Sequence, residues 1–386
     1  MDISPFFHAI DSELFPATLC PDPDMWGRRI QTHEGGFPSW KEAHIVLMGA
    51  TAPEEESEEE SAPHAIRRQL YQLSVPDSDL KVVDLGDLIP KESQESYHER
   101  LAYVMNVLLT AGKTVLIMGG RQELVYGQYM GYEELEQEIE YVQIDARFDL
   151  EDSEWALNER SYNHKVFLHQ PEYLFNFTNL GYQRYFVSET QLQVLKNLNY
   201  AAIRYGELAG NIEEVEPYLR MADMVSMDLS SIRSSEAPGV FRPSPGGFTA
   251  EEACRMARYA GLGYQVKSFS LTELAPQHDQ RDQSSLLSAL ILWYFVQGYA
   301  HRKSDAPNQN RSNLRKYTVR LHASIEAIHF YCHPTTGRWW MEVPYQHSLG
   351  KKKPKTKLVP CSQLDYEFAK GDDIPERWWL AYNKLS

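Results

Sequence analysis

The sequence has few cysteines, no long apolar run and no excess of positive charge. Its four cysteines are far apart and form no Cys-x-x-Cys pair, so neither a zinc site nor a disulfide framework is predicted for Cys20, Cys254, Cys332 and Cys361. No apolar run reaches membrane-spanning length, and no basic and apolar signal segment opens the chain. The net charge of −16 over 386 residues argues against binding to nucleic acid or to anionic membranes. We therefore expect a cytoplasmic protein without a nucleic-acid or membrane partner.

Short apolar segments alternate with helical patterns through most of the chain. About eight of these segments have the length and composition of buried strands: His44–Gly49, Lys81–Leu85, Thr114–Met118, Tyr141–Ile144, Glu172–Phe177, Asn199–Arg204, Asp223–Asp228 and Tyr264–Ser270. Helices are predicted between them, at Ser96–Ala111, from Gly120 to about Glu140, at Ser188–Asn197, at Thr249–Ala260 and at Ser284–Gly298. Thr249 followed by Glu252 forms a capping-box pattern at the start of one helix. This alternation predicts an α/β fold, a three-layer αβα sandwich around an about eight-stranded parallel sheet.

The composition changes at both ends of this pattern. We expect a lead-in segment at residues 1–42, an α/β domain at residues 43–300 and a small β-rich C-terminal appendage at residues 301–386. The acidic run at residues 54–60 is predicted to be a solvated loop. Residues 323–344 read as a β-hairpin with a glycine in its turn.

Polar residues follow three of the predicted strands at the point where each strand ends. Gln122 follows the Gly119-Gly120 pair, Asp145 and Asp149 follow the strand that ends at Ile144, and Asp228 and Ser230 end a third. The carboxyl ends of parallel strands meet at one edge of the sheet, where open α/β folds bind their ligands. The sequence therefore predicts one shared polar site.

These three segments resemble the metal-binding motifs of the ureohydrolases, the family of arginase, agmatinase and formiminoglutamase, and most closely those of formiminoglutamase. The family motifs are Gly-Gly-x-His, Asp-Ala-His-x-Asp and Ser-x-Asp-x-Asp, which supply the ligands of a two-manganese site. Here residues 119–122 read GGRQ, residues 145–149 read DARFD and residues 226–230 read SMDLS. Three ligand positions are kept and three are changed. The resemblance implies an arginase-like eight-stranded parallel sheet with a degenerate metal site.

Carried over position by position, the resemblance implies at most one metal. Its oxygen ligands would be Gln122, Asp145, Asp149 and Asp228, a set suited to Mg²⁺, Ca²⁺ or Mn²⁺. The second metal would need Arg147, which cannot ligate a metal, and Ser230, a poor ligand at a lost ligand position. We therefore expect one divalent cation or none, and no two-manganese cluster.

Arg147 offers a physical alternative to the second metal. Buried carboxylates require a cation or a proton. We expect the Arg147 guanidinium to replace the charge of that metal by bridging Asp145 and Asp228 in a bidentate manner.

Four further residues match the family. Glu273 and Pro276 fall in its Val-Glu-x-Asn-Pro segment, which implies that Glu273 pairs with the guanidinium or amidine of a substrate. His164 lies at about the spacing of the family's proton-shuttling histidine. A lone histidine in a loop is more often a surface residue, however, and we therefore favour a place on the surface for His164. Arg67 ends a segment similar to Gly-Pro-x-x-Ile-Arg, and we expect it to cap or ion-pair on a helix surface.

The residues of the predicted site are compatible with two functions, and the C-terminal extension suggests a third. The first is a non-catalytic or altered-activity homologue that binds a small amidine or guanidine-like ligand. The second is a hydrolase of a linear amidine such as formiminoglutamate that uses one metal or none. The third is an interaction module, which exposed tryptophans among Trp339, Trp340, Trp378 and Trp379 would favour. The resemblance also leaves a homo-oligomer open.

Overall fold

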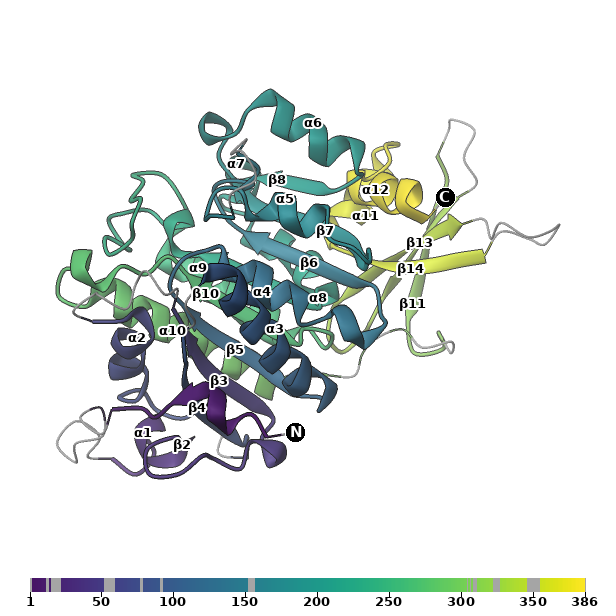
Figure 1. Ribbon diagram of the computed structural model, residues 1–386. Coiled ribbons are helices and arrows are strands. Elements are labelled where there is room, and N and C mark those ends of the chain that lie inside the picture. Colours follow the sequence, from purple (N-terminus) through teal and green to yellow (C-terminus); the bar gives the residue numbers. More distant parts are fainter. Residues whose placement is uncertain are drawn as a thin grey trace.

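The computed structural model describes most of the chain: residues 2–11, 14, 22–51, 60–76, 79–90, 93–151, 157–303, 305, 307, 311–321, 327–345 and 355–385. Figure 1 shows a large central sheet with helices on its faces and a separate small sheet near the C-terminus. No described helix has the length and apolar character needed to cross a membrane. The predicted acidic loop lies outside the described residues except for its last residue, Glu60.

The central sheet has ten strands in the described part of the chain, in the order β1-β4-β3-β5-β10-β9-β6-β7-β8, with β2 paired to β4. Eight of them form the parallel sheet that the sequence predicts: β3 (Ile45–Ala50), β4 (Val82–Leu88), β5 (Thr114–Gly119), β6 (Ile139–Ile144), β7 (Leu174–Tyr182), β8 (Ala201–Arg204), β9 (Met224–Asp228) and β10 (Ser268–Thr272). The fold class is therefore confirmed. The lead-in adds two short strands, the antiparallel β1 (Phe7–His8) and the parallel β2 (Gln31–Thr32), which both pair with β4.

Helices cover both faces of the sheet. On one face lie α2 (Ala62–Leu70), α8 (Glu216–Met221), α9 (Ala250–Leu262) and α10 (Gln283–Ala300). On the other lie α3 (Gln94–Thr110), α4 (Leu124–Met130), α5 (Tyr162–Phe167) and α6 (Glu189–Asn197). Short helices α1 (Trp26–Arg29) and α7 (Tyr205–Leu208) complete the main domain in the described residues. Figure 1 shows α3 and α4 over the sheet on the near side.

Two helix predictions have different outcomes. The capping box at Thr249 is present, with the Thr249 side chain and the Glu252 side chain each accepting a backbone N–H of the other residue. The long helix expected from Gly120 to Glu140 is wrong. The helix there ends at Met130, a short 3-10 helix over Glu133–Leu135 follows, and the left-handed backbone at Glu136 redirects the chain into β6.

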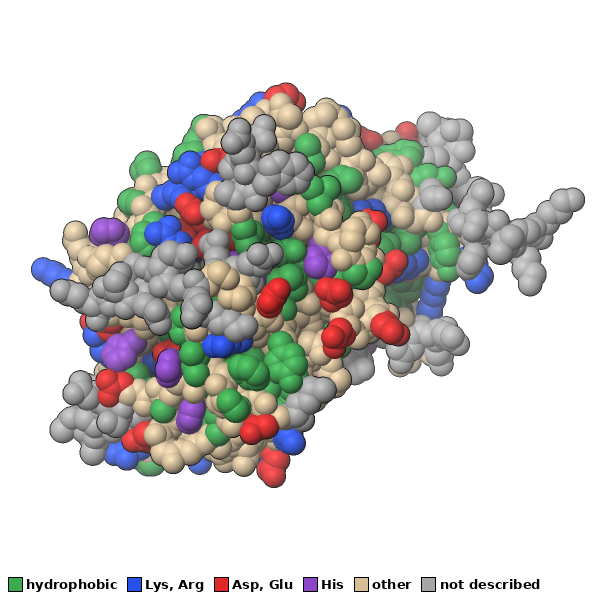
Figure 2. All heavy atoms as spheres, viewed as in Figure 1, with side chains coloured by type: hydrophobic (Ala, Val, Ile, Leu, Met, Phe, Trp, Pro, Cys, Tyr) green, Lys and Arg blue, Asp and Glu red, His purple; other side chains and the backbone are tan. Residues whose placement is uncertain are grey.

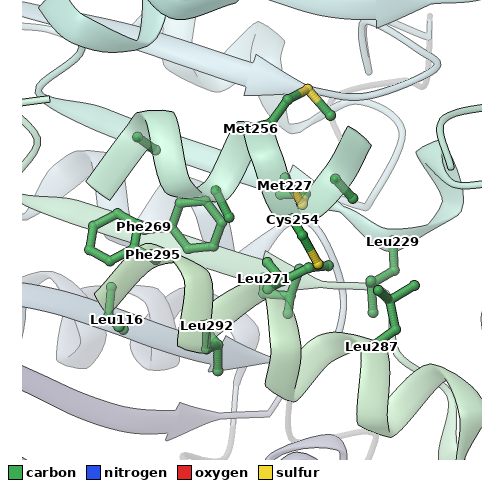
Figure 3. Packing of buried hydrophobic residues seen from close by; sticks show 14 of the residues in the cluster. Leu116, Met227, Leu229, Cys254, Met256, Phe269, Leu271, Leu287, Leu292 and Phe295 are labelled. Atoms are coloured by element: carbon green, nitrogen blue, oxygen red, sulfur yellow. The ribbon is translucent and has the colours of Figure 1, made fainter. Parts of the chain in front are cut away.

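The core on the α9–α10 face depends on a close approach of these two helices. A Cβ atom at Gly261 would lie 2.1 Å from the Phe295 carbonyl oxygen, and one at Gly298 would lie 2.3 Å from that of Arg258. Glycine at both positions lets the helices pack closely enough to bury their apolar faces. Figure 3 shows the resulting cluster, in which the Phe269 ring of β10 faces the Phe295 ring of α10 at a centroid distance of 5.1 Å.

Arg67 has a buried structural role, so its expected place on a helix surface is wrong. Its side chain is 1% exposed and donates two hydrogen bonds of 2.9 Å to the carboxylate of Asp84 and one of 2.5 Å to Asp87. Asp84 also accepts from the Tyr71 hydroxyl at 2.9 Å. The hydrophobic spacing of α2 could not reveal this, since both partners lie on β4.

The C-terminal extension forms a small module of its own. Its four-stranded antiparallel sheet contains β11 (Arg315–Val319), β12 (Ile328–Cys332), β13 (Trp339–Tyr345) and β14 (Lys355–Cys361), packed against α11 (Gln363–Lys370) and α12 (Glu376–Leu385). The predicted hairpin is the antiparallel β12–β13 pair. Figure 1 places this module beside the β8 side of the main sheet.

The aromatic residues of the module mostly build its own core. Trp340 and Trp378 are 1% and 4% exposed, and the Trp339 ring stacks on Tyr366. Only Trp379 of these four tryptophans is exposed, at 41%. Figure 2 shows acidic, basic and apolar side chains interspersed on the visible face. The tryptophans therefore give little support to the interaction-module hypothesis.

Candidate functional site

The polar residues predicted at the strand ends lie together at the carboxyl edge of the sheet. Asp145 follows β6 directly, Asp228 is the last residue of β9, and Glu273 follows β10. Since β6, β9 and β10 are neighbours in the sheet, their ends are adjacent. These three side chains and that of Asp149 are buried, with exposed fractions between 0% and 6%.

A buried glutamine links two of the carboxylates. The Nε2 of Gln143 donates to Asp149 Oδ2 at 2.6 Å, to Asp145 Oδ2 at 3.0 Å and to the Tyr162 hydroxyl at 3.0 Å. Its Oε1 accepts from Asn163 at 3.1 Å and from Asn179 at 3.4 Å. Gln143 therefore fixes the spacing of Asp145 and Asp149.

Gln122 and Glu273 belong to the same network. The backbone N–H of Gln122 donates to Glu273 Oε1 at 2.9 Å, and its Nε2 donates to the Tyr162 hydroxyl at 3.2 Å. The side-chain oxygen of Gln122 accepts from the Thr272 hydroxyl. The amide of Gln122 is thus engaged on both of its polar atoms.

Two of the carboxylate residues have an uncommon backbone conformation. Asp149 has φ 50° and Glu273 has φ 68°, both in the left-handed region that non-glycine residues seldom adopt. Such conformations cost about 1–3 kcal/mol each and cluster at functional sites. Here they turn two carboxylates into the same buried space.

The carboxylates of this cluster resist ionisation. Burial, together with the negative charge of Asp228, raises the pKa of Asp149 to about 7 and that of Glu273 to about 8. Burial also holds the pKa of Asp145 and of Asp228 well above the ordinary range, with a further increase from the neighbouring aspartates. The cluster must therefore hold protons or a cation near neutral pH.

Arginines surround the cluster without pairing directly with it. The guanidinium of Arg147 lies 3.9 Å from the centroid of the Phe186 ring, and that of Arg121 lies 4.6 Å from the Phe241 ring. Among the described side chains no ion pair joins Arg147 to Asp145 or Asp228, so the bidentate bridge expected there is wrong. The guanidinium stacks on the Phe186 ring instead. Its charge still lowers the pKa values of the two aspartates, and the backbone N–H of Arg147 donates to Asp145 at 2.8 Å.

His164 lies on the surface, as favoured from the sequence, while its two preceding neighbours reach the site. His164 is exposed on α5, whereas Tyr162 and Asn163 are buried in the network around Gln143. Sequence reasoning missed these residues and Gln143. The signal for Gln143 was available, because it lies on β6 two residues before Asp145, a spacing that places both side chains on the same side of the extended chain. No such spacing in the sequence indicates that Tyr162 belongs to the site.

The donor set differs from the family's two-metal motifs at three positions, Gln122, Arg147 and Ser230. Arg147 cannot be a ligand, and the backbone N–H of Ser230 donates to Asp228 Oδ1 at 2.5 Å. The Gln122 oxygen is taken by Thr272. Within the described residues, no group of three or more His, Cys, Asp or Glu side chains is arranged to hold a metal ion.

Comparison with known proteins identifies the class. The sequence model of the arginase family matches residues 43–297, so the chain belongs to the arginase family. Its curated relatives include the formimidoylglutamases of Streptococcus gordonii, 26% identical over 62% of this chain and 77% of the relative, and of Macrococcus caseolyticus, 26% identical over 61% and 76%.

Solved structures agree on the fold. The crystal structure of Trypanosoma cruzi formiminoglutamase with two Mn²⁺ ions has a TM-score of 0.65 at 20% identity, covering 72% of this chain and 99% of that one. Formimidoylglutamase from Bacillus subtilis has a TM-score of 0.63 at 20% identity, covering 73% and 94%. The chain is thus a formiminoglutamase-like member of the arginase family with changed residues at three motif positions.

Proposed function

We propose that this protein binds a small ligand carrying an amidine or guanidinium group in the carboxylate cluster, and that it lacks the two-manganese reaction of its relatives. The observation that carries this proposal is the engagement of Gln122: both polar atoms of its amide are bonded to protein groups, at a position where the family motif has a histidine. An organic cation supplies the positive charge that the buried carboxylates require, without needing six metal ligands.

Glu273 is the proposed partner of the ligand cation. It is 2% exposed, it follows β10 at the same edge as Asp228, and its orientation is set by the hydrogen bond from the Gln122 backbone. A planar amidinium can donate two parallel hydrogen bonds to a carboxylate, as arginine does. Ligand binding would stabilise the ionised form of Glu273, whose pKa is about 8 without it.

A second candidate is hydrolysis of a linear amidine such as formiminoglutamate with one divalent cation or none. The raised pKa of Glu273, about 8, favours it, because a carboxyl group that titrates near neutral pH can act as a general acid or base. Against it, a single cation cannot clamp and activate a water as two metals do.

The experiment combines metal analysis, calorimetry and an activity screen on the purified full-length chain. We expect no more than one divalent cation per chain, binding heats with formamidine, agmatine or formiminoglutamate, and no release of ammonia, urea or formamide. Binding should fall by about tenfold or more in Glu273→Gln, which keeps an oxygen for the Gln122 N–H. The matched control Glu189→Gln, at a side chain 79% exposed, should bind as the wild type does.

Three outcomes would decide against the first function. Two manganese ions per chain would contradict the absence of the cluster. Product release at one cation or none would establish the second function instead. No heat with any amidine or guanidine, or unchanged affinity in Glu273→Gln, would refute the ligand assignment.

A further inference from the structure

A cavity lies between the main sheet and the C-terminal module. It has a volume of about 90 Å³ and is lined by the beginnings of β6, β7 and β8, by α8, and by β14 and α12 of the module. Glu140, the second residue of β6, lines this cavity, whereas Asp145 of the carboxylate cluster follows the last residue of the same strand. Five residues of strand separate the two by about 16 Å, so this cavity is distinct from the carboxylate cluster.

The walls of this cavity are mostly apolar, with a few charged groups. The apolar part comes from both sides of the boundary and includes Phe175, Met221, Leu358, Val359, Leu380 and Leu385. Its size suits several waters or a small organic molecule. A partly apolar cavity with a few converging polar groups is the usual form of a small-molecule site.

Opposite charges face each other across the cavity. Glu140 stands on the main sheet, and Lys357 and Lys384 stand on the module. Burial raises the pKa of Glu140 to about 7, and the positive charges of Lys357 and Lys384 oppose that rise. Burial likewise lowers the pKa of Lys384 to about 8. These charges are therefore near enough to interact.

They nevertheless form no direct ion pair in the described structure. The Lys384 Nζ donates to the Leu198 carbonyl at 3.0 Å and lies 4.0 Å from the Tyr200 ring centroid. The Lys357 Nζ lies 5.0 Å from the Phe175 ring centroid. A molecule that carries both a carboxylate and an ammonium group could pair its ammonium with Glu140 and its carboxylate with the two lysines.

The other charged groups nearby are already paired or lie at the edge. Arg377 donates to Asp365 and to the Glu214 carbonyl. Asp223 accepts the backbone N–H of Glu140 at 3.0 Å, and its negative charge adds to the raised pKa of Glu140. Glu172, whose negative charge raises the pKa of Lys384, is exposed and lies outside the lining of the cavity. Glu140, Lys357 and Lys384 are therefore the charged lining groups that can recognise a ligand.

We propose that this cavity binds a small apolar α-amino acid, with its ammonium on Glu140 and Asn176, its carboxylate on Lys357 and Lys384, and its side chain against the apolar wall. The Asn176 amide already hydrogen-bonds Glu140 and lies opposite it in the strand register. Because the ligand contacts both the main sheet and the module, its binding stabilises their association. The site is independent of the amidine site proposed above.

Calorimetry and thermal melting of the full-length chain test this proposal. L-leucine, L-phenylalanine and L-methionine are the probes, and 4-methylpentanoate and isoamylamine each lack one of the two charged groups. We expect at least one amino acid to release heat and raise the melting temperature, with affinity reduced about tenfold or more for both single-charge analogues. Equal binding of either analogue would overturn the assignment of an amino acid.

Variants separate ligand recognition from folding. Glu140→Gln and Lys384→Met should each weaken amino-acid binding about tenfold or more. Lys370→Met, at an exposed lysine paired with Glu367, is the matched control and should leave it unchanged. Ala381→Leu fills the cavity from α12 without changing a charge, and should abolish binding while the melting temperature holds or rises. Unchanged affinity in these cavity variants, or no binding of any probe by the wild type, would refute the site.

Discussion

Replacing Asp149 by asparagine should make the protein more stable at neutral and alkaline pH. Asp149 is 4% exposed, lies beside Asp145 and Asp228, and has its pKa raised from 3.8 to about 7. Asparagine keeps an oxygen for the 2.6 Å hydrogen bond from Gln143 and offers an N–H to the neighbouring carboxylates. It also tolerates the left-handed backbone at this position, with φ 50°, better than most residues.

The sign of the pH dependence follows from the raised pKa. Since Asp149 binds its proton more tightly in the native state than in the unfolded state, its protonation contributes stability that is fully present below about pH 4. That stability is lost as the pH rises through about 7. At about 1.4 kcal/mol per pKa unit, the difference between 3.8 and about 7 corresponds to about 4 kcal/mol. Coupling to Asp145 and Asp228 spreads this cost over the cluster, so a gain of about 2–4 kcal/mol is expected at pH 8.

The assay is thermal unfolding of the wild type and of Asp149→Asn at a series of pH values from 4.5 to 8. A chelator is present so that no divalent cation occupies the cluster. The melting temperature of the variant should exceed that of the wild type by an amount that grows with pH. Asp24→Asn, at a side chain 74% exposed, should show no such trend. A difference that stays constant over this range would show that Asp149 is already ionised in the native state, and the electrostatic account of the site would fail.

Three further predictions concern the fold and the metal site. Arg67→Ala should lower the free energy of unfolding by about 3–5 kcal/mol in chemical denaturation, because it leaves a buried aspartate unpaired; a loss below about 1 kcal/mol would contradict this. Gly181→Ala should destabilise by about 1–3 kcal/mol, since φ is +104° and a Cβ would lie 2.3 Å from the Phe248 ring. Gly112→Ala, with positive φ but open space, should cost less in the same melts. The triple variant Gln122→His, Arg147→His and Ser230→Asp restores the ligands of the family motifs. Its manganese content, measured by elemental analysis, should rise toward two ions per chain, and an unchanged content would count against the ligand assignment.

The sequence by itself determined the parallel sheet and the position of the carboxylates on it. Alternating apolar segments and helices permit few arrangements, and right-handed crossovers bring the ends of parallel strands to one edge. Asp145 and Asp228 therefore had to lie at the same edge of the sheet, whereas their adjacency depends on the strand order that places β9 beside β6. The three altered motif positions could also be recognised from the sequence alone, because a change of residue type at a matched position is visible without the structure.

Only the tertiary structure decided which partners these residues take. Arg147 stacks on the Phe186 ring instead of bridging the aspartates, and Phe186 comes from a segment whose distance to Arg147 no sequence-spacing rule gives. Arg67 is buried for the same kind of reason, since its partner Asp84 lies on strand β4 and not on the helix that carries Arg67.

The cavity between the main sheet and the C-terminal module is the clearest case of information that the chain order does not carry. Glu140 reads as a residue near the start of a core strand, and Lys384 reads as a charge at the end of a terminal helix. They come to line one cavity because the C-terminal module docks on the main sheet, with Arg220 donating to the carbonyls of Trp339 and Cys361. Local sequence sets the type of each element. The burial that shifts a pKa and the packing that closes a cavity depend on which distant surfaces come together.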